Sequence, residues 1–230
     1  MTPKERIEAG LNTTILIVGD SLTPEESYGY PYRVAELLGI KYPTAKVMIE
    51  MRSFDLTQPL PPASCIQTGT GGPTITIIRD GVPGSTSLQA ISSPRFDRIF
   101  SETPIHLFSM FFGTNDFLQS YDNNNYISNL VFLGNTAKQT YGADVTVITP
   151  AWYGNYLNLG IAGYASLARL AAYRGGFKCV DASKIFQQHY QLGNGLFGQG
   201  DWFADPNDTV HFSRNGHYAI ADEFMRVNFS

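Results

Sequence analysis

Cysteine is scarce in this chain of 230 residues: there are two, Cys65 and Cys179, and they lie far apart. Two distant cysteines provide neither a disulfide framework nor the paired spacing of a zinc site. We therefore expect both thiols to be free and buried, and we expect no metal site built on them.

Long apolar runs and basic clusters are also missing. No segment approaches the ~18 consecutive apolar residues of a membrane-spanning helix. No run of Lys or Arg stands out, and the net charge is −4. These features argue against a membrane span and against nucleic acid as a partner. The first residues, MTPKERIEAGLN, are polar and helix-prone, which is unlike a secretory signal.

Hydrophobic and aromatic residues, in contrast, are plentiful. The hydrophobic fraction of 43% is enough for one large domain with a sizeable core, which we assign to residues 1–230. Aromatic residues make up 13%, including thirteen Tyr. They fit an aromatic-lined groove for carbohydrate or another ligand, and they equally fit a well-filled core with an aromatic surface.

Five short apolar runs predict the strands of one sheet. They are Thr14–Val18, Thr74–Arg79, Ile105–Phe112, Val145–Thr149 and Phe177–Val180. The runs are nearly continuous rather than alternating, which is typical of a parallel sheet buried on both faces. Helix-like stretches lie between and after them, at Tyr32–Leu38, Ser87–Phe100, Tyr126–Thr140, Ile161–Tyr173 and Ser213–Val227. This alternation predicts a three-layer α/β/α sandwich with right-handed crossovers.

One region departs from this alternation. Lys46–Met51 has the pattern of an extra strand, and Ser53–Pro73 is rich in Pro, Thr and Gly. We interpret Tyr42–Pro73 as a hairpin or long loop inserted before the second core strand.

Polar residues follow the predicted strands directly. Ser21 follows the first strand, Gly84 the second and Asn115 the third, and His211 lies in the segment after the fifth. Ligands of an open parallel sheet bind beyond the carboxyl ends of its strands, so these four residues can converge on one edge.

This set meets the requirements of acyl transfer. A serine hydroxyl such as that of Ser21 needs a base to take its proton, and the neutral imidazole of His211 is a suitable one. Asp208 lies three residues before His211, so a single turn can bring its carboxylate to the other ring nitrogen. Asp205 competes with Asp208 for this role, although its six-residue spacing makes a less natural reach.

A tetrahedral oxyanion also needs hydrogen-bond donors. The backbone amides of Ser21 and Gly84 and the side-chain amide of Asn115 can supply three. Glycine suits position 84 because a side chain would obstruct the approach of the carbonyl oxygen. We expect Asp20 and Asp116 to stabilise their loops rather than to react.

Four sequence blocks in this order resemble the SGNH hydrolases, the GDSL-type esterase and lipase superfamily. The blocks are Gly19-Asp20-Ser21-Leu22-Thr23, Gly81-Val82-Pro83-Gly84, Gly113-Thr114-Asn115-Asp116 and Asp208-Thr209-Val210-His211. The resemblance implies a flavodoxin-like sheet and a hydrolase without metal or other cofactor. It also implies that Ser21 is the nucleophile and that Gly84 and Asn115 are oxyanion donors.

The chain departs from the family pattern in its second block. Asp80 stands where the family often has Asn, and Pro83 replaces a common small residue. The segment IQTGTGGPTITIIRDGVPGS is similar to SGNH domains embedded in bacteriophage tail fibres and tailspikes. We accordingly expect a cytoplasmic chain, or a virion-associated one if it is a domain of a larger secreted or phage tail protein.

The family's substrates range from acetylated sugars to acyl glycerols, acyl-CoA and lysophospholipids. The polar, proline-rich loop and the aromatic post-strand loops favour an O-acetyl esterase acting on a polysaccharide, with Trp152 and Tyr153 as candidate substrate contacts. A short-chain acyl esterase, lipase or thioesterase is the alternative. A glycan-binding or structural module with an idle triad is the alternative outside enzymes. His217 is expected to face solvent or to pack against the sheet.

Overall fold

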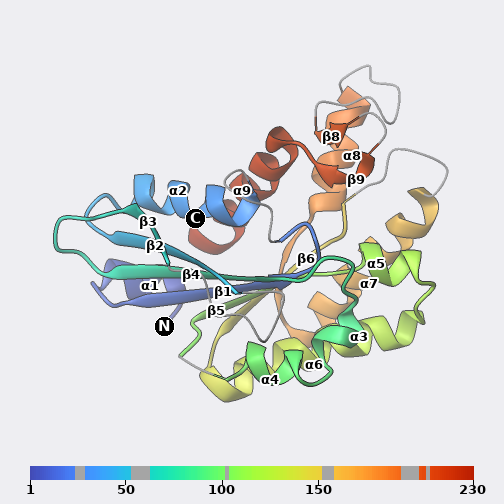
Figure 1. Ribbon diagram of the computed structural model, residues 1–230, viewed down its shortest axis with the longest axis horizontal. Helices are drawn as coiled ribbons and strands as arrows, with labels where there is room; N and C mark the ends of the chain where they lie inside the picture. The colour runs from blue at the N-terminus through green and yellow to red at the C-terminus, as the bar shows by residue number, and fades with distance from the viewer. Residues whose placement is uncertain (24–28, 53–62, 102–103, 152–157, 193–201, 206–207) are drawn as a thin grey trace.

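The computed structural model describes residues 1–23, 29–52, 63–101, 104–151, 158–192, 202–205 and 208–230. A seven-stranded sheet, in the order β3-β2-β4-β1-β5-β6-β7, lies between two layers of helices (Figure 1). Its strands are β1 (Thr13–Gly19), β2 (Lys46–Met51), β3 (Ser64–Gln67), β4 (Thr74–Gly81), β5 (Leu107–Phe111), β6 (Asp144–Ile148) and β7 (Lys178–Val180). A separate two-stranded sheet pairs β8 (Phe203–Asp205) with β9 (Asp208–Phe212).

The helices divide between the two faces of the main sheet. One face packs against α1 (Pro3–Glu8), α2 (Tyr30–Lys41), α8 (Ala182–Leu192) and α9 (Arg214–Phe229). The other face packs against α3 (Ser87–Ala90), α4 (Arg95–Ile99), α5 (Thr114–Leu118), α6 (Asn123–Tyr141) and α7 (Asn158–Gly175). The predicted three-layer α/β/α architecture is confirmed.

The five predicted strands are consecutive in the sheet and run parallel to one another. In spatial order they are β4, β1, β5, β6 and β7. Numbered along the chain, this is the 2-1-3-4-5 order of flavodoxin-like sheets. The strand ends that precede the predicted site residues are therefore neighbours in space.

The continuous apolar run of β1 has a direct structural cause. Successive side chains of a strand point to opposite faces. Ile15 and Ile17 enter the core beneath α2 and α9, whereas Leu16 and Val18 enter the core on the side of α6 and α7. All four are fully buried, so β1 has no polar face.

In the region 42–73, the predicted strand Lys46–Met51 is confirmed as β2, and its antiparallel pairing with β3 forms a hairpin that belongs to the main sheet. Strand β2 pairs in parallel with β4 and antiparallel with β3. The sheet therefore extends beyond the five core strands by β2, which was predicted, and by β3, which was not. Lys46 is exposed and Glu50 is half-buried, and both interrupt the apolar run that marked the central strands.

The two cysteines are free, but the prediction that both are buried is wrong. Cys65 is exposed because it lies on β3, the edge strand of the sheet. Cys179 lies on the other edge strand, β7, and is half-buried.

Two further differences concern helices. The stretch Ser87–Phe100 forms two short helices, α3 and α4, instead of one. Pro94 separates them, because proline lacks an N–H group and disfavours helical backbone at the residue before it. Helices α5 and α8 were not predicted. In the described part of the chain, no helix has both the length and the apolar character needed to cross a membrane.

Candidate active site

The candidate nucleophile lies in a tight turn directly after β1. The amide of Thr23 donates to the carbonyl of Asp20 at 3.1 Å, which closes the turn around Ser21. A Cβ at Gly19 would lie 2.1 Å from Thr23 Oγ1 and 2.7 Å from the carbonyl oxygen of Phe111. Glycine is therefore required at the strand end, where the turn packs directly against β5.

The candidate base reaches this turn from a distant part of the sequence. His211 Nε2 lies 3.1 Å from Ser21 Oγ, although the two residues are 190 positions apart in the sequence. His211 belongs to β9, which with β8 lies beyond the carboxyl end of the main sheet (Figure 1). This distance is within the hydrogen-bond reach that a general base needs.

The segment holding the candidate acid differs from the prediction. Asp208 begins strand β9 and does not form a single turn with His211. In a regular strand, residues three apart project to opposite faces, but the pairing of β8 with β9 contains a register shift. The backbone of Asp205 pairs across from that of Asp208. Both carboxylates lie outside the described side chains, so the choice between them stays a prediction.

Gly84, the first candidate oxyanion donor outside the turn, lies in the loop after β4. Its φ is +73°, in the left-handed region that favours glycine. No atom of the chain lies within 4 Å of a Cβ built at this position, so backbone conformation and not crowding by the protein requires glycine there. Hydrogen bonds to neighbouring segments hold the loop: Val82 N donates to the Gly19 carbonyl at 3.1 Å, and Gln119 Nε2 donates to the Gly84 carbonyl at 3.2 Å.

Asn115, the other candidate donor, lies in the first turn of α5. The helix follows Gly113, whose φ is +127° and whose Cβ, if present, would lie 2.7 Å from the hydroxyl of Tyr126. Asn115 Nδ2 donates to Asp20 Oδ2 at 3.2 Å, which links this helix to the turn of Ser21. An amide carries two N–H hydrogens, and this bond uses one of them.

Two buried carboxylates hold these loops in place. Asp20 Oδ1 accepts from Leu22 N at 3.0 Å, and burial raises the pKa of Asp20 to about 7. Asp116 accepts from the amide of Ser87 at 3.0 Å and from its hydroxyl at 2.6 Å. Burial also raises the pKa of Asp116, and the hydrogen bonds from Ser87 oppose that shift. Both carboxylates thus hold the turns next to Ser21 and Asn115.

His217, the second histidine near the candidate base, is part of the core. It is fully buried, lies parallel to Tyr30 with ring centroids 6.4 Å apart, and packs edge-on against Phe212 at 5.5 Å. Burial lowers the pKa of His217 to about 3, so the ring is neutral at ordinary pH. Of the two expected positions, facing solvent is wrong, because the ring is buried against Tyr30 and Phe212.

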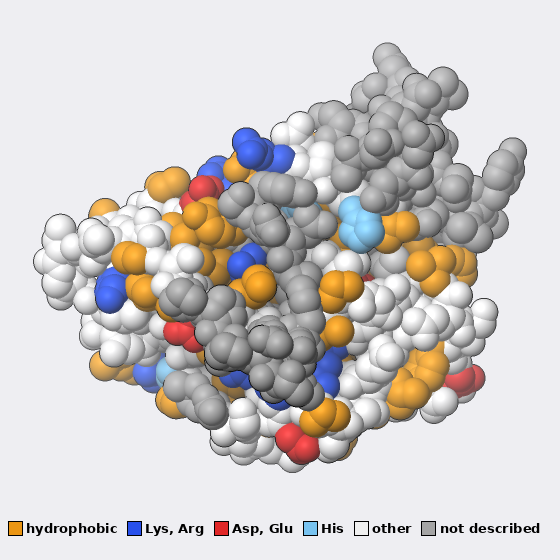
Figure 2. Space-filling model, in the orientation of Figure 1, with side chains coloured by type: hydrophobic (Ala, Val, Ile, Leu, Met, Phe, Trp, Pro, Cys, Tyr) orange, Lys and Arg blue, Asp and Glu red, His pale blue; other side chains and the backbone are white. Residues whose placement is uncertain are grey.

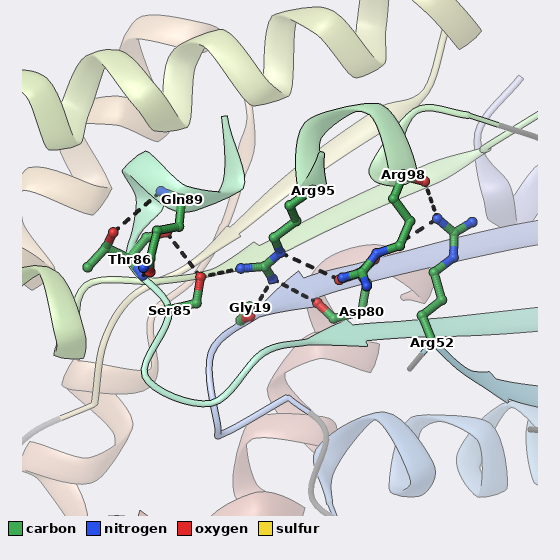
Figure 3. Close-up of polar contacts among 8 residues, drawn as sticks. All are labelled: Gly19, Arg52, Asp80, Ser85, Thr86, Gln89, Arg95 and Arg98. Atoms are coloured by element: carbon green, nitrogen blue, oxygen red, sulfur yellow. Dashed lines mark hydrogen bonds and ion pairs between the residues drawn. The ribbon is translucent and has the colours of Figure 1, made fainter. Parts of the chain in front are cut away.

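A group of arginines beside the site had no counterpart in the sequence analysis. The Asp80 carboxylate is fully buried, and Arg98 binds it through Nη2 at 2.7 Å and through Nε at 3.1 Å (Figure 3). Arg95 Nε lies 3.6 Å from the same carboxylate, and Arg52 Nη1 lies 4.0 Å from it. The clue in the sequence was Asp80 itself: an acid where the family often has an amide needs a cation if it is buried.

A cavity of about 320 Å³ opens next to Gly84. It is bordered by residues 82–85 of the loop after β4 and, from the other side, by Ser92, Pro94, Arg95 and Arg98. Trp152 and Tyr153, the predicted substrate contacts, lie outside the described residues.

Comparison with known proteins identifies the family. The model of the GDSL-like Lipase/Acylhydrolase family matches residues 17–219, from β1 to α9, and the chain belongs to this family. It is accordingly a hydrolase of the esterase type. No curated protein matches the sequence.

Solved structures of similar fold include acetyl xylan esterases. A variant of Axe2, an acetyl xylan esterase from Geobacillus stearothermophilus, is 20% identical, with 96% of this chain and 98% of that chain covered and a TM-score of 0.68. The acetyl xylan esterase AlAXEase is 18% identical, with coverages of 93% and 98% and a TM-score of 0.70. LAE5, an α/β hydrolase from the metagenome of Lake Arreo, Spain, is 17% identical, with coverages of 95% and 97% and a TM-score of 0.69. These likenesses concern the fold.

Proposed function

We propose that this chain is a carbohydrate O-acetyl esterase with Ser21 as nucleophile, His211 as base and Asp208 as the acid that orients the imidazole. The observation that carries the proposal is the 3.1 Å distance between Ser21 Oγ and His211 Nε2, because it joins a hydroxyl and a base from opposite parts of the sequence. Family membership independently assigns ester hydrolysis to the chain.

In the acylation step, Ser21 Oγ attacks the carbonyl carbon of the ester while His211 Nε2 takes the hydroxyl proton. The carbonyl oxygen becomes an oxyanion, and the amides of Ser21 and Gly84 and the side chain of Asn115 donate to it. Each such donor contributes about 3 kcal/mol to stabilising the transition state. The carbon–oxygen bond to the sugar then breaks, and His211 returns its proton to the departing sugar oxygen.

In the deacylation step, a water molecule replaces the sugar. His211 takes a proton from this water, whose oxygen attacks the carbonyl carbon of the acyl-enzyme. The bond between that carbon and Ser21 Oγ breaks, and Ser21 recovers its proton from His211. The products are acetate and a free sugar hydroxyl, and the enzyme returns to its starting state.

Two observations favour an acetylated carbohydrate over a lipid. Two of the similar structures are described as acetyl xylan esterases, and they are covered over almost their whole length. On the face shown in Figure 2, the hydrophobic side chains of the described residues lie in small separate groups. An enzyme that works on a lipid surface presents a larger apolar area.

The esterase assignment is tested with p-nitrophenyl acetate. We expect turnover by the wild-type chain and a loss of at least about 10⁴-fold in Ser21→Ala, because without the nucleophile only the residual catalysis by the oxyanion donors and by substrate binding is left. Asp208→Asn and Asp205→Asn, a matched pair on the paired strands β9 and β8, identify the acid. We expect a loss of about 10²-fold or more in the first and nearly wild-type turnover in the second. Equal rates in wild type and Ser21→Ala would contradict the esterase proposal and would support the alternative of a binding module with an idle triad.

The substrate class is tested by acetate release from acetylated xylooligosaccharides, measured beside p-nitrophenyl esters of increasing acyl length. We expect kcat/KM to be highest for the acetylated sugar and to fall beyond the shortest acyl chains. A rising preference for longer acyl chains, or for thioesters, would instead support the acyl esterase or thioesterase alternative.

A further inference from the structure

Arg95 lies at the point where the three central strands end. It is the first residue of α4 and comes from no motif, yet it is 7% exposed. Its guanidinium contacts the last residue of β1, the segment after β4 and the segment after β5. The predicted nucleophile Ser21 follows β1, and the predicted oxyanion donors Gly84 and Asn115 follow β4 and β5.

In each of these segments, the residue that Arg95 contacts lies within three positions of the predicted site residue. Arg95 Nη2 donates to the carbonyl of Gly19 at 2.7 Å, two residues before Ser21 (Figure 3). Arg95 Nη1 donates to the hydroxyl of Ser85, the residue after Gly84 (Figure 3). Its Cζ lies 5.5 Å from the ring centroid of Phe112, three residues before Asn115.

Asp80 also contacts the guanidinium of Arg95. Nη2 also donates to the backbone carbonyl of Asp80 at 3.2 Å, and Nε faces the Asp80 carboxylate. A planar fork of five N–H groups can satisfy acceptors in several directions at fixed angles, whereas a lysine ammonium is a point charge on a flexible stem. Arginine is therefore suited to fix the spacing between separate segments.

We propose that Arg95 is a positioning residue that sets the distance between the Ser21 nucleophile and the oxyanion donors Gly84 and Asn115. This inference rests on the proposed function, because it assigns Arg95 a part in the same reaction. The consequence concerns the transition state. Loosening the three segments displaces the donors from the oxyanion and leaves the weaker contacts to the ester substrate nearly unchanged.

The experiment compares Arg95→Met with Arg98→Met on p-nitrophenyl acetate. Both variants remove a guanidinium from the buried Asp80 carboxylate, but Arg98 lies on the side of Asp80 away from Ser85 (Figure 3). Functional sites are counted with a fluorophosphonate, which forms a phosphorus–oxygen bond to Ser21 with loss of fluoride. For each counted site we expect kcat of Arg95→Met to fall roughly 100-fold with little change in KM, as a displacement of about 1 Å can cause. Arg98→Met should retain its kcat per site.

A purely structural role gives a different result. In that case both variants lose thermal stability and countable sites, while kcat per remaining site stays at the wild-type value. That outcome overturns the proposal, and so does an equal loss of kcat in the two variants. Full recovery of kcat in Arg95→Lys also overturns it, because positive charge rather than the fork would then be sufficient.

Ser85→Ala keeps the proposal testable if Arg95→Met does not fold. It removes one acceptor of the fork and leaves the guanidinium and Asp80 intact. We expect a loss of about tenfold in kcat per site, because the contact that fixes the loop of Gly84 to Arg95 is lost. Unchanged kcat in Ser85→Ala contradicts the proposal. If the wild-type chain shows no turnover, or if its turnover does not depend on Ser21, the proposed function itself is refuted. That outcome differs from a failure of the Arg95 proposal alone.

Discussion

Single glycines determine where backbone amides of this site can point. At Gly84 the amide is held by a φ of +73° in a loop that leaves open space where a side chain would begin. At Gly19 the situation is reversed, because a Cβ would overlap Thr23 Oγ1. One position thus needs glycine for its conformation and the other for its lack of volume.

This difference gives a prediction with a matched control inside the chain. Gly142 ends α6 at a φ of +67°, also with open space around a Cβ, so alanine at position 84 or 142 meets similar backbone strain. We expect each substitution to lower the free energy of unfolding by about 1–2 kcal/mol. Gly84→Ala should in addition lower kcat/KM for p-nitrophenyl acetate by about 10²-fold, because its Cβ would obstruct the approach of the oxyanion to the amide at this position. Equal activity of folded Gly84→Ala and Gly142→Ala would show that Gly84 is not an oxyanion donor.

At the scale of elements, the sequence predicted best what depends on local pattern. The central strands were predictable because burial on both faces leaves a continuous apolar run, as in β1. Strand β2 lies nearer the edge, and its alternating burial resembles that of an ordinary hairpin. The break between α3 and α4 was visible in Pro94 and was overlooked.

The candidate site was predictable to the extent that motifs mark strand ends. Ser21 and His211 come together as predicted, because a parallel sheet gathers its carboxyl ends at one edge. Spacing alone could not show that Asp208 starts a strand, since β9 forms only by pairing with β8. Arg95 was missed because it belongs to α4, and only the folding of that helix against three strand ends gives it contacts.

The packing of α9 against α2 and β9 buries His217. The effect of His217 on the pH dependence of stability is opposite to that of Asp20. The pKa of Asp20 rises from 3.8 to about 7, so its stabilising contribution is complete below pH 3.8 and is lost as pH rises through 7. The pKa of His217 falls from 6.5 to about 3, so its contribution is present above pH 6.5 and is lost as pH falls toward 3. Between about pH 4 and 6.5 the two slopes, each about 1.4 kcal/mol per pH unit, offset one another.

Removing the histidine should therefore expose the effect of Asp20. Phenylalanine at position 217 keeps a ring between Tyr30 and Phe212 and cannot be protonated. We expect the free energy of unfolding of His217→Phe, relative to wild type, to increase by about 3 kcal/mol between pH 7 and pH 4. Urea denaturation across this range measures the difference, and parallel pH profiles for the two proteins would contradict it.

At the scale of the whole molecule, the main sheet separates two apolar cores that share its central strand. Leu16 contributes to the core on the side of α6, and Ile17 to the core beneath α2. Both side chains are fully buried on β1. A strand common to both cores should couple their unfolding; that residues 1–230 form one domain stays a prediction.

This coupling can be measured with one substitution on each side. Leu16→Ala and Ile17→Ala should each lower the free energy of unfolding by about 3 kcal/mol, because each leaves a cavity in a packed core. We expect both to shift the same single transition in thermal unfolding. If either variant unfolds in two steps, the two cores are independent units.

The two-stranded sheet of β8 and β9, which carries His211, stands apart from the strands that hold Ser21, Gly84 and Asn115. During synthesis, the segments of the hydroxyl and the amide donors leave the ribosome long before this hairpin does. A nascent chain that has folded its central strands but ends before residue 211 holds Ser21 without the imidazole that lies beside it in the full fold. If His211 is the base, as proposed, ester hydrolysis begins only after translation has passed residue 211.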